Sequence, residues 1–289
     1  MSKFKNYWKL IKSLQTFLLL ITGITGYLSA KCPYTHPWEF SGMVISLFLT
    51  ISGTTVFNMV WDRHIDAKMD RTKNRPIPAG EVSEKNAIIY ASVLLIVGLV
   101  WGYFLSPLYA AILFAGFFFD FIVYSVWLKQ RSPWSIVFGG ISGGMPVLAG
   151  RTLAVGHIDT IGIFLALGIL FWIPTHIITF NIKYYDDYAK AGVPTFPHRL
   201  GVKRSRYLIA ASSIISALSF IFVAYILGLE WGFLRIMGLL GIGLIAVAIL
   251  AVIKPNDKNN MRLFKIASLY MLFAMVIIAV ASMSMRGTI

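Results

Sequence analysis

Three polar side chains recur at every fourth position where a long apolar stretch ends. Asn58, Asp62 and Asp66 are spaced four residues apart, and the preceding stretch 40–57 contains no charged residue. On a helix these positions share one face, and two carboxylates there would repel each other unless a cation lay between them. Mg²⁺ binds through one or two carboxylates together with substrate phosphates, so the pattern favours a magnesium site. The alternative is a solvated helix end in which the carboxylates pair with neighbouring basic residues.

Basic residues follow directly. Lys68, Arg71, Lys73 and Arg75 fall within eight positions. Arginine forks and lysine point charges are the usual groups that bind a diphosphate, so carboxylates beside this cluster favour a Mg²⁺–diphosphate ligand. The alternative is that these charges only hold the connection on one side of a membrane.

A second acidic cluster appears much later in the chain. Asp186 and Asp187 follow another apolar run and lie near Lys183 and Lys190. If both clusters face one cavity, they could hold Mg²⁺ ions around a single diphosphate. The leaving group would then be stabilised, and an allylic cation could form in a pocket of aromatic faces. This chemistry is prenyl transfer from a prenyl diphosphate.

The elements that position these residues are membrane helices. Of the 289 residues, 57% are hydrophobic and only 13% are charged, whereas soluble domains carry about 25% charge. Runs of about 20 apolar residues cross a bilayer as helices. We predict an all-α, polytopic single domain over residues 1–289, with nine transmembrane helices around a central cavity open to the cytoplasmic side. The predicted spans are 13–30, 40–61, 87–105, 108–127, 135–153, 161–181, 207–228, 232–253 and 264–285.

Charge in the connections predicts the orientation. Lysine and arginine gather in the N-terminal tail and in every second connection, and the intervening connections are nearly free of them. The positive-inside rule then predicts a multi-pass protein of the cell membrane with a cytoplasmic N-terminus and the C-terminus outside. The net charge of +14 suits anionic lipid headgroups, and we expect no nucleic-acid partner, because the aromatic residues lie in apolar runs. Cys32 is the sole cysteine and has no internal disulfide partner.

Several stretches resemble one enzyme family. "NMVWDRHID" (58–66) resembles the N-D-x-x-D-x-x-x-D motif of UbiA-type intramembrane prenyltransferases, with Met59 in place of an aspartate. "IDAKMDRTKNRP" resembles the I-D-x-x-M-x-R-T-x-x-R-P of the haem O synthases, the protohaem IX farnesyltransferases. "YSVWLKQRSP", "FWIPTHIITF" and "DYAKAGVPTFP" resemble further segments of that group, in the same order. The resemblance covers about residues 55–200.

The resemblance implies a role for each polar cluster. Mg²⁺ would be the cofactor, a prenyl diphosphate such as farnesyl diphosphate the donor and haem B the acceptor. The acceptor would meet His176 of the W-x-P-x-H segment, and Arg151 stands where the family usually has tryptophan. The implied catalytic and metal-binding residues are Asn58, Asp62, Asp66, Asp186 and Asp187. The implied diphosphate-binding residues are Lys68, Arg71, Lys73, Arg75, Lys129, Arg131 and Lys183.

Alternatives remain open at this point. His176 could be a buried histidine bonded to a neighbouring helix. Asp120 lies within a predicted span, where a charge is expensive and usually functional, or it pairs with a base near the interface. Another UbiA-type enzyme would share the Mg²⁺ site and prenylate an aromatic quinone precursor or a glycerol phosphate lipid. A secondary transporter would more often show repeat symmetry and charges at mid-membrane.

Overall fold

The computed structural model describes residues 3–30 and 34–284. The described residues form helices and no strand, so the predicted all-α fold is confirmed. Cys32 lies outside the described residues. The helices, in chain order, are α1 Lys3–Leu10, α2 Ser13–Leu28, α3 Pro37–Trp61, α4 Arg63–Asp66, α5 Glu84–Leu105, α6 Pro107–Phe117, the π-helix η1 Phe118–Leu128, α7 Ser135–Val155, α8 Thr160–Lys183, α9 Tyr185–Lys190, α10 Phe196–Ile226, α11 Trp231–Ile253 and α12 Asp257–Ser284.

The long helices match the predicted spans. Among the described residues, eight spans are long and apolar enough to cross a membrane, with α6 and η1 counted as one, and the pair α1 and α2 makes a ninth candidate. That pair is bent by 53°. The sequence places the starts of several of these helices: Ser83 and Ser106 accept hydrogen bonds from the first turns of α5 and α6, and Asp159 caps α8. The protein is therefore a multi-pass membrane protein.

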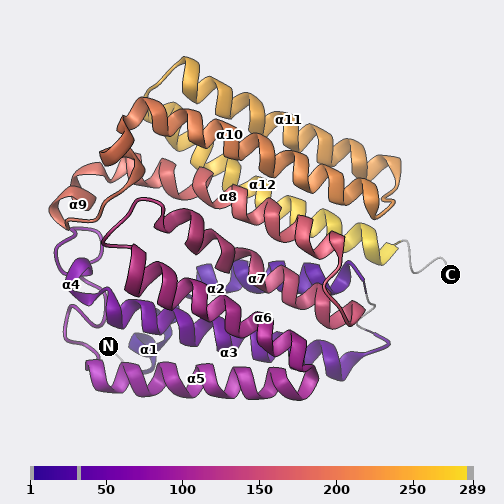
Figure 1. Ribbon diagram of the computed structural model, residues 1–289, viewed down its shortest axis with the longest axis horizontal. Helices are drawn as coiled ribbons and strands as arrows, with labels where there is room; N and C mark the ends of the chain where they lie inside the picture. The colour runs from indigo at the N-terminus through magenta and orange to yellow at the C-terminus, as the bar shows by residue number, and fades with distance from the viewer. Residues whose placement is uncertain (1–2, 31–33, 285–289) are drawn as a thin grey trace.

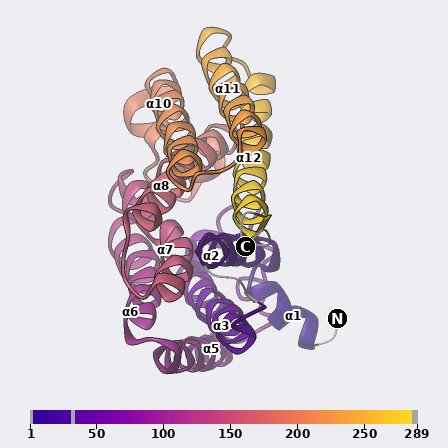
Figure 2. The ribbon, with the colours of Figure 1, turned by 90° about the vertical axis from the view of Figure 1, so that its right-hand side faces the viewer.

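The helices pack as two groups that meet at α7 (Figures 1 and 2). One apolar cluster joins α2, α3, α6 and α7, and a larger one joins α7, α8, α10, α11 and α12. Glycine allows α2 and α7 to approach closely, because a Cβ on Gly26 would collide with the Val147 carbonyl and a Cβ on Gly150 with the Gly23 carbonyl. The glycine-rich segment 135–153, one of the predicted spans, is therefore a central packing helix.

The two polar connections lie at the same end of the bundle. Figure 1 shows α4 and α9 there, while the last helix, α12, ends on the opposite side of the bundle. A small apolar cluster of Ile65, Met69 and Val193, with Tyr188 and Ala191 packed against it, joins the connection after α4 to the one after α9. Segments more than 100 residues apart in the chain are thus held together at the end that carries the charge.

Candidate active site

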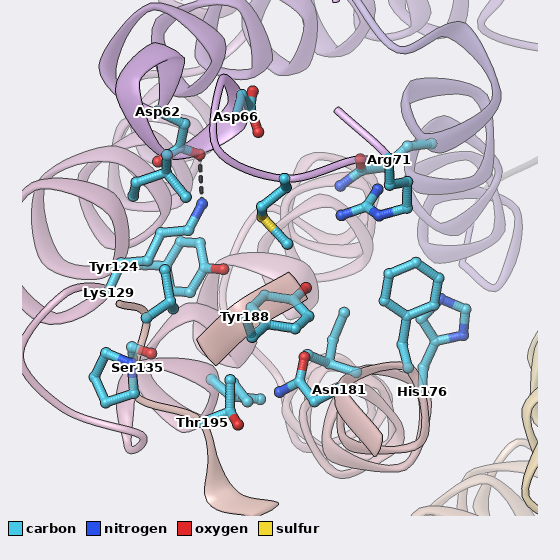
Figure 3. Close-up of a pocket in the computed structure, with 18 of the residues that line it drawn as sticks. Asp62, Asp66, Arg71, Tyr124, Lys129, Ser135, His176, Asn181, Tyr188 and Thr195 are labelled. Atoms are coloured by element: carbon cyan, nitrogen blue, oxygen red, sulfur yellow. Dashed lines mark hydrogen bonds and ion pairs between the residues drawn. The ribbon is translucent and has the colours of Figure 1, made fainter. Parts of the chain in front are cut away.

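A polar cavity of about 240 Å³ lies at this end of the bundle (Figure 3). It is bordered by the start of α2, by the end of α3 with α4 and the following connection, by η1, by α8 and by the connection after α9. The charged residues and the histidine that line it are Lys12, Asp62, Asp66, Arg71, Arg75, Lys129 and His176. Of the predicted site residues, the structure therefore brings six together in one cavity, drawn from three separate parts of the chain.

Asp62 is the carboxylate at the end of α3. Its side chain is 5% exposed, and its Oδ2 forms an ion pair with Lys129 from the end of η1 (Figure 3). Burial alone would lower the pKa of Lys129, but the Asp62 carboxylate beside it raises that pKa above its usual value. Asp62 Oδ1 is buried and has no hydrogen-bond partner among the described residues. One oxygen of this carboxylate is therefore free to bind a cation.

Asp66 ends the short helix α4 and is also buried. Its Oδ2 accepts a hydrogen bond from Arg75 Nη1 at 2.6 Å, and its backbone carbonyl accepts one from Thr72 Oγ1 at 2.9 Å. These two contacts fold the connection back over α4. Arg71, in the same connection, lies 4.9 Å from the ring centroid of Phe180 on α8, so its guanidinium is held above an aromatic face at the cavity wall.

Asn58 lies one turn before Asp62 on α3 and is buried. Its Nδ2 donates to Asp120 Oδ2 at 2.7 Å, and its Oδ1 accepts a hydrogen bond from Ser125 Oγ at 2.9 Å. Asn58 lines neither this cavity nor the apolar one described below. Its amide is instead fixed between α3 and η1, beside residues that do line them.

The donor set fits a hard divalent cation that shares its ligands with a substrate. No three His, Cys, Asp or Glu side chains come together among residues 3–30 and 34–284, so the protein does not offer a complete cage of its own. Mg²⁺ does not require one, since it typically binds through one or two carboxylates and completes its shell with phosphate oxygens and water. Asp62 and Asp66 both line the polar cavity, and Asp62 Oδ1 lacks a partner in the described part of the chain.

The second acidic cluster lies beside the cavity and does not line it. Asp186 is exposed and Asp187 is half-buried on α9. The neighbours that line the cavity are Asn181 on α8 and Tyr188 on α9. Asn181 is 2% exposed, and its Oδ1 has no partner among the described residues. Lys68, Lys73, Arg131 and Lys183 are exposed residues outside the lining.

A larger, mostly apolar cavity of about 590 Å³ continues from the polar one. The two share Gln15, Tyr124, Ile136, His176 and Ile177 in their walls. The apolar cavity extends between α2, α3, α6, η1, α7, α8 and α12, down to residues such as Leu47, Leu113 and Met145. Charged groups thus meet apolar space at a single boundary, which suits a ligand with an anionic head and a greasy tail.

His176 stands at that boundary. Its ring is stacked between Trp172 and Phe264, with centroid distances of 4.8 and 4.4 Å. Ser268 Oγ lies 3.2 Å from its Nδ1, so a neighbouring helix holds one ring nitrogen. His176 is therefore a buried histidine bonded to a neighbouring helix, and it also lines both cavities.

Arg151 lies away from this site. Its guanidinium forms an ion pair with Asp159 at 2.7 Å and donates to the Ser29 carbonyl at 2.7 Å. Although partial burial opposes the shift, the arginine holds the pKa of Asp159 below its usual range. Neither residue lines a cavity described here. Arg151 therefore clamps α2, α7 and α8 together, and the expectation that it meets an acceptor has no geometric support.

Sequence reasoning missed seven polar residues of the lining: Lys12, Gln15, Tyr124, Ser135, Asn181, Tyr188 and Thr195. In the sequence, Lys12 served as one of the N-terminal basic residues that predict the orientation across the membrane. In the structure it occupies the bend between α1 and α2 with φ +45°. Such a conformation is uncommon for a non-glycine residue and clusters at functional sites. The signal available in the sequence was a lysine immediately before an apolar run that is followed by an acidic motif. Tyr124 and Tyr188 stand in the family-like stretches "YSVWLKQRSP" and "DYAKAGVPTFP", which were the available signal for them, whereas Asn181 carries no comparable signal.

The comparisons agree with this geometry. The chain matches the model of the UbiA prenyltransferase family over residues 19–279. It is 43% identical over 206 residues to a protein of Korarchaeum cryptofilum named protoheme IX farnesyltransferase, covering 71% of this chain and 69% of that one. It is 36% identical over 283 residues to a protein of the same name from Pyrobaculum arsenaticum, covering 94% and 98%.

Solved structures share the fold. One concerns digeranylgeranylglyceryl phosphate synthase in membranes; it has a TM-score of 0.81 at 22% identity and covers 98% of this chain and 100% of its own. Another is a UbiA homologue of Archaeoglobus fulgidus bound to DMAPP and Mg²⁺, with a TM-score of 0.66 at 17% identity, covering 95% and 99%. These identities support the fold alone. The family match over residues 19–279, nearly the whole chain, shows that this protein belongs to the UbiA prenyltransferase family.

Proposed function

We propose that this prenyltransferase moves a farnesyl group from farnesyl diphosphate to haem B, with Mg²⁺ as cofactor, and so forms haem O. The observation that carries the proposal is the junction of a small charged cavity with a large apolar one at Tyr124 and His176. The relatives named protoheme IX farnesyltransferase, at 43% and 36% identity, support the choice of donor and acceptor.

The polar cavity would bind the diphosphate. Its cationic groups are Lys12, Arg71, Arg75 and Lys129. Asp62 and Asp66, with Asn58 one turn behind, would hold Mg²⁺, and Asp186 and Asp187 would add negative charge from α9, whose Tyr188 lines the cavity. Bound Mg²⁺ would neutralise the charge that develops on the diphosphate oxygens. The exposed residues Lys68, Lys73, Arg131 and Lys183 would attract the anionic donor from solution.

The cationic side chains make ionisation of the donor feasible. When the allylic C–O bond breaks, the electron pair leaves with the diphosphate, and preorganised charges around it lower the barrier. The allylic carbon would then lie at the boundary of the two cavities. Tyr124 lies there with its ring beside the Lys129 ammonium, and aromatic faces stabilise cations.

The apolar cavity would hold the acceptor and the prenyl tail. A vinyl carbon of haem B would form the new C–C bond to the allylic carbon, water would add to the resulting cation, and the water's proton would be released. On α8, Trp172 and His176 line this cavity and stack at 4.8 Å, and with Phe180, one turn further on, they form a stripe of flat side chains. Such a stripe suits a planar macrocycle.

Charge distribution supports a cytoplasmic position for the polar cavity. Lys12 and the basic connections around α4, η1 and α9 all belong to the lysine- and arginine-rich side. The proposal therefore places the N-terminus and the diphosphate site on the cytoplasmic side and the C-terminus outside. The donor would bind from the cytoplasm, and its tail would enter the helix bundle.

The test is reconstitution with defined substrates. Purified protein is incubated with haem B, Mg²⁺ and farnesyl diphosphate, and the porphyrin product is analysed by mass spectrometry. We expect a product whose mass corresponds to haem B plus a farnesyl group and one hydroxyl group. Asp62→Ala and Asp66→Ala should each lower turnover by at least about 100-fold, because the leaving group loses charge stabilisation. A wild-type protein that ignores haem and prenylates an aromatic acid or a lipid glycerol would contradict the acceptor.

His176→Ala separates the acceptor from the donor site. We expect weaker haem binding, measured by Soret absorbance, with unchanged binding of farnesyl diphosphate. The donor site should survive because the charged groups of the polar cavity come from other residues. Unchanged haem affinity together with unchanged product would rule out a role for His176 in acceptor binding.

A further inference from the structure

Asp120 is a carboxylate inside a membrane span that is paired with no cation among the described residues. It lies in η1 and borders the apolar cavity. Its Oδ2 accepts the Asn58 amide hydrogen at 2.7 Å. Ser142 Oγ lies 3.5 Å from Oδ1 but donates to the Gly139 carbonyl at 2.6 Å, so Asn58 is the main partner. Carboxylates within spans are costly and usually functional, and this one is directed at a motif residue.

The other end of the same amide is held as well. Ser125 Oγ donates to Asn58 Oδ1 at 2.9 Å, and Ser125 is 1% exposed. We call Asn58, Asp120 and Ser125 the amide clamp. A carboxylate oxygen accepts a hydrogen bond from the amide NH₂ and repels the amide oxygen. Asp120 therefore holds the Asn58 side chain with its NH₂ toward Asp120 and its oxygen turned away. That oxygen has two lone pairs, and Ser125 uses one of them.

The π-helix makes the clamp possible. Asp120 and Ser125 are five residues apart, and in an α-helix such positions point about 140° away from each other. In η1 the backbone bonds run from residue i to i+5, which brings both side chains to one face. Lys129, which follows η1, then meets Asp62 one turn along α3 from Asn58. The π-helix and the lysine that follows it therefore place polar side chains against both Asn58 and Asp62, which lie one turn apart.

We propose that Asp120 is a positioning residue that orients the Asn58 amide so that its oxygen, and not its NH₂, is available to Mg²⁺. The inference rests on the proposed function, in which Asn58 belongs to the magnesium site. Asp120 acts through Asn58 and needs only an acceptor atom to do so. An amide free to flip would present hydrogens to the cation for part of the time and would weaken its binding.

The experiment measures Mg²⁺ affinity apart from turnover. Mg²⁺ is titrated by calorimetry into full-length protein in nanodiscs, in the presence of saturating farnesyl thiolodiphosphate, a donor analogue that reacts slowly. Asp120→Leu removes the acceptor, and we expect Mg²⁺ binding to weaken by about 10- to 100-fold, as is typical when a partner of a metal ligand is lost. Asp120→Asn keeps an acceptor oxygen within reach of Asn58, and we expect affinity within about threefold of wild type.

Tyr109→Phe is the matched structural control. Tyr109 makes a buried hydrogen bond between α6 and α3, at 2.8 Å to Ser46, and neither residue lines a cavity. Its loss should lower the melting temperature without changing Mg²⁺ affinity. Wild-type affinity in Asp120→Leu would overturn the inference, and so would an equal loss in Asp120→Asn, because that result would make the charge of Asp120 the active property. Failure of wild-type protein to bind Mg²⁺ with the analogue would instead overturn the magnesium site itself.

Discussion

At the scale of single residues, Lys12 has the sharpest consequence. Its ammonium borders the polar cavity and has no hydrogen bond or ion pair from the described residues. A cation in that position suits the diphosphate, and a hydrogen bond to a charged group is worth about 1.5–3 kcal/mol. Lys12→Met should therefore weaken binding of farnesyl diphosphate by about 10- to 100-fold, measured by calorimetry.

Lys9→Met is the control for Lys12. Lys9 lies three residues earlier, outside the cavity lining, and its ammonium pairs with Glu81 at 3.9 Å on the surface. Both substitutions remove one positive charge from the same end of the molecule. If the two variants lose donor affinity equally, the effect comes from the general field and Lys12 makes no direct contact.

At the scale of elements, the connections after α4 and α9 form a cover over the polar cavity. Met69 is 2% exposed and packs against Ile65 and Val193. Met69→Ala should open this contact at a local cost of about 2–5 kcal/mol. Trypsin should then cleave more rapidly after the exposed basic residues Lys68, Arg71 and Lys73, as gel analysis of a time course would show.

Asp70→Ala tests the same connection at its surface. Asp70 pairs with Lys73 at 2.8 Å and with Lys190 at 3.4 Å, but all three side chains are more than half exposed. Exposed ion pairs contribute little, so this variant should be cleaved like wild type. Faster cleavage in Asp70→Ala than in Met69→Ala would show that charge, and not apolar packing, holds the cover closed.

The elements also show where sequence reasoning succeeds. Four-residue spacing predicted a shared face, and Asp62 and Asp66 do line the same cavity, whereas the Asn58 amide one turn earlier is held between α3 and η1. Spacing could not reveal η1, because a π-helix depends on tertiary contacts that no periodicity records. Adjacent carboxylates on α9 could not be ranked from sequence either, since a six-residue helix can turn them toward or away from the cavity.

At the scale of the whole molecule, hydropathy predicted the spans because bilayer thickness fixes helix length. The predicted span 207–228 overlaps α10, which begins earlier, at Phe196, bends at Gly201 with φ +80°, and ends at Ile226. Residues such as Arg151 were misjudged because pairing across the fold decided their role. Its partners Asp159 and Ser29 come from different connections, and no local pattern links them.

The orientation across the membrane is the prediction that belongs to the whole molecule. Connections of alternating charge predict that Tyr34, which is 81% exposed between α2 and α3, faces the outside and that Lys258, at the start of α12, faces the cytoplasm. In a Cys32→Ser background, Tyr34→Cys should react with a membrane-impermeant maleimide in intact cells. Lys258→Cys should react only after permeabilisation. The reverse labelling pattern would mean that the protein has the opposite orientation in the membrane. The polar cavity lies at the same end as α4 and α9, so it would then be on the side away from the cytoplasm.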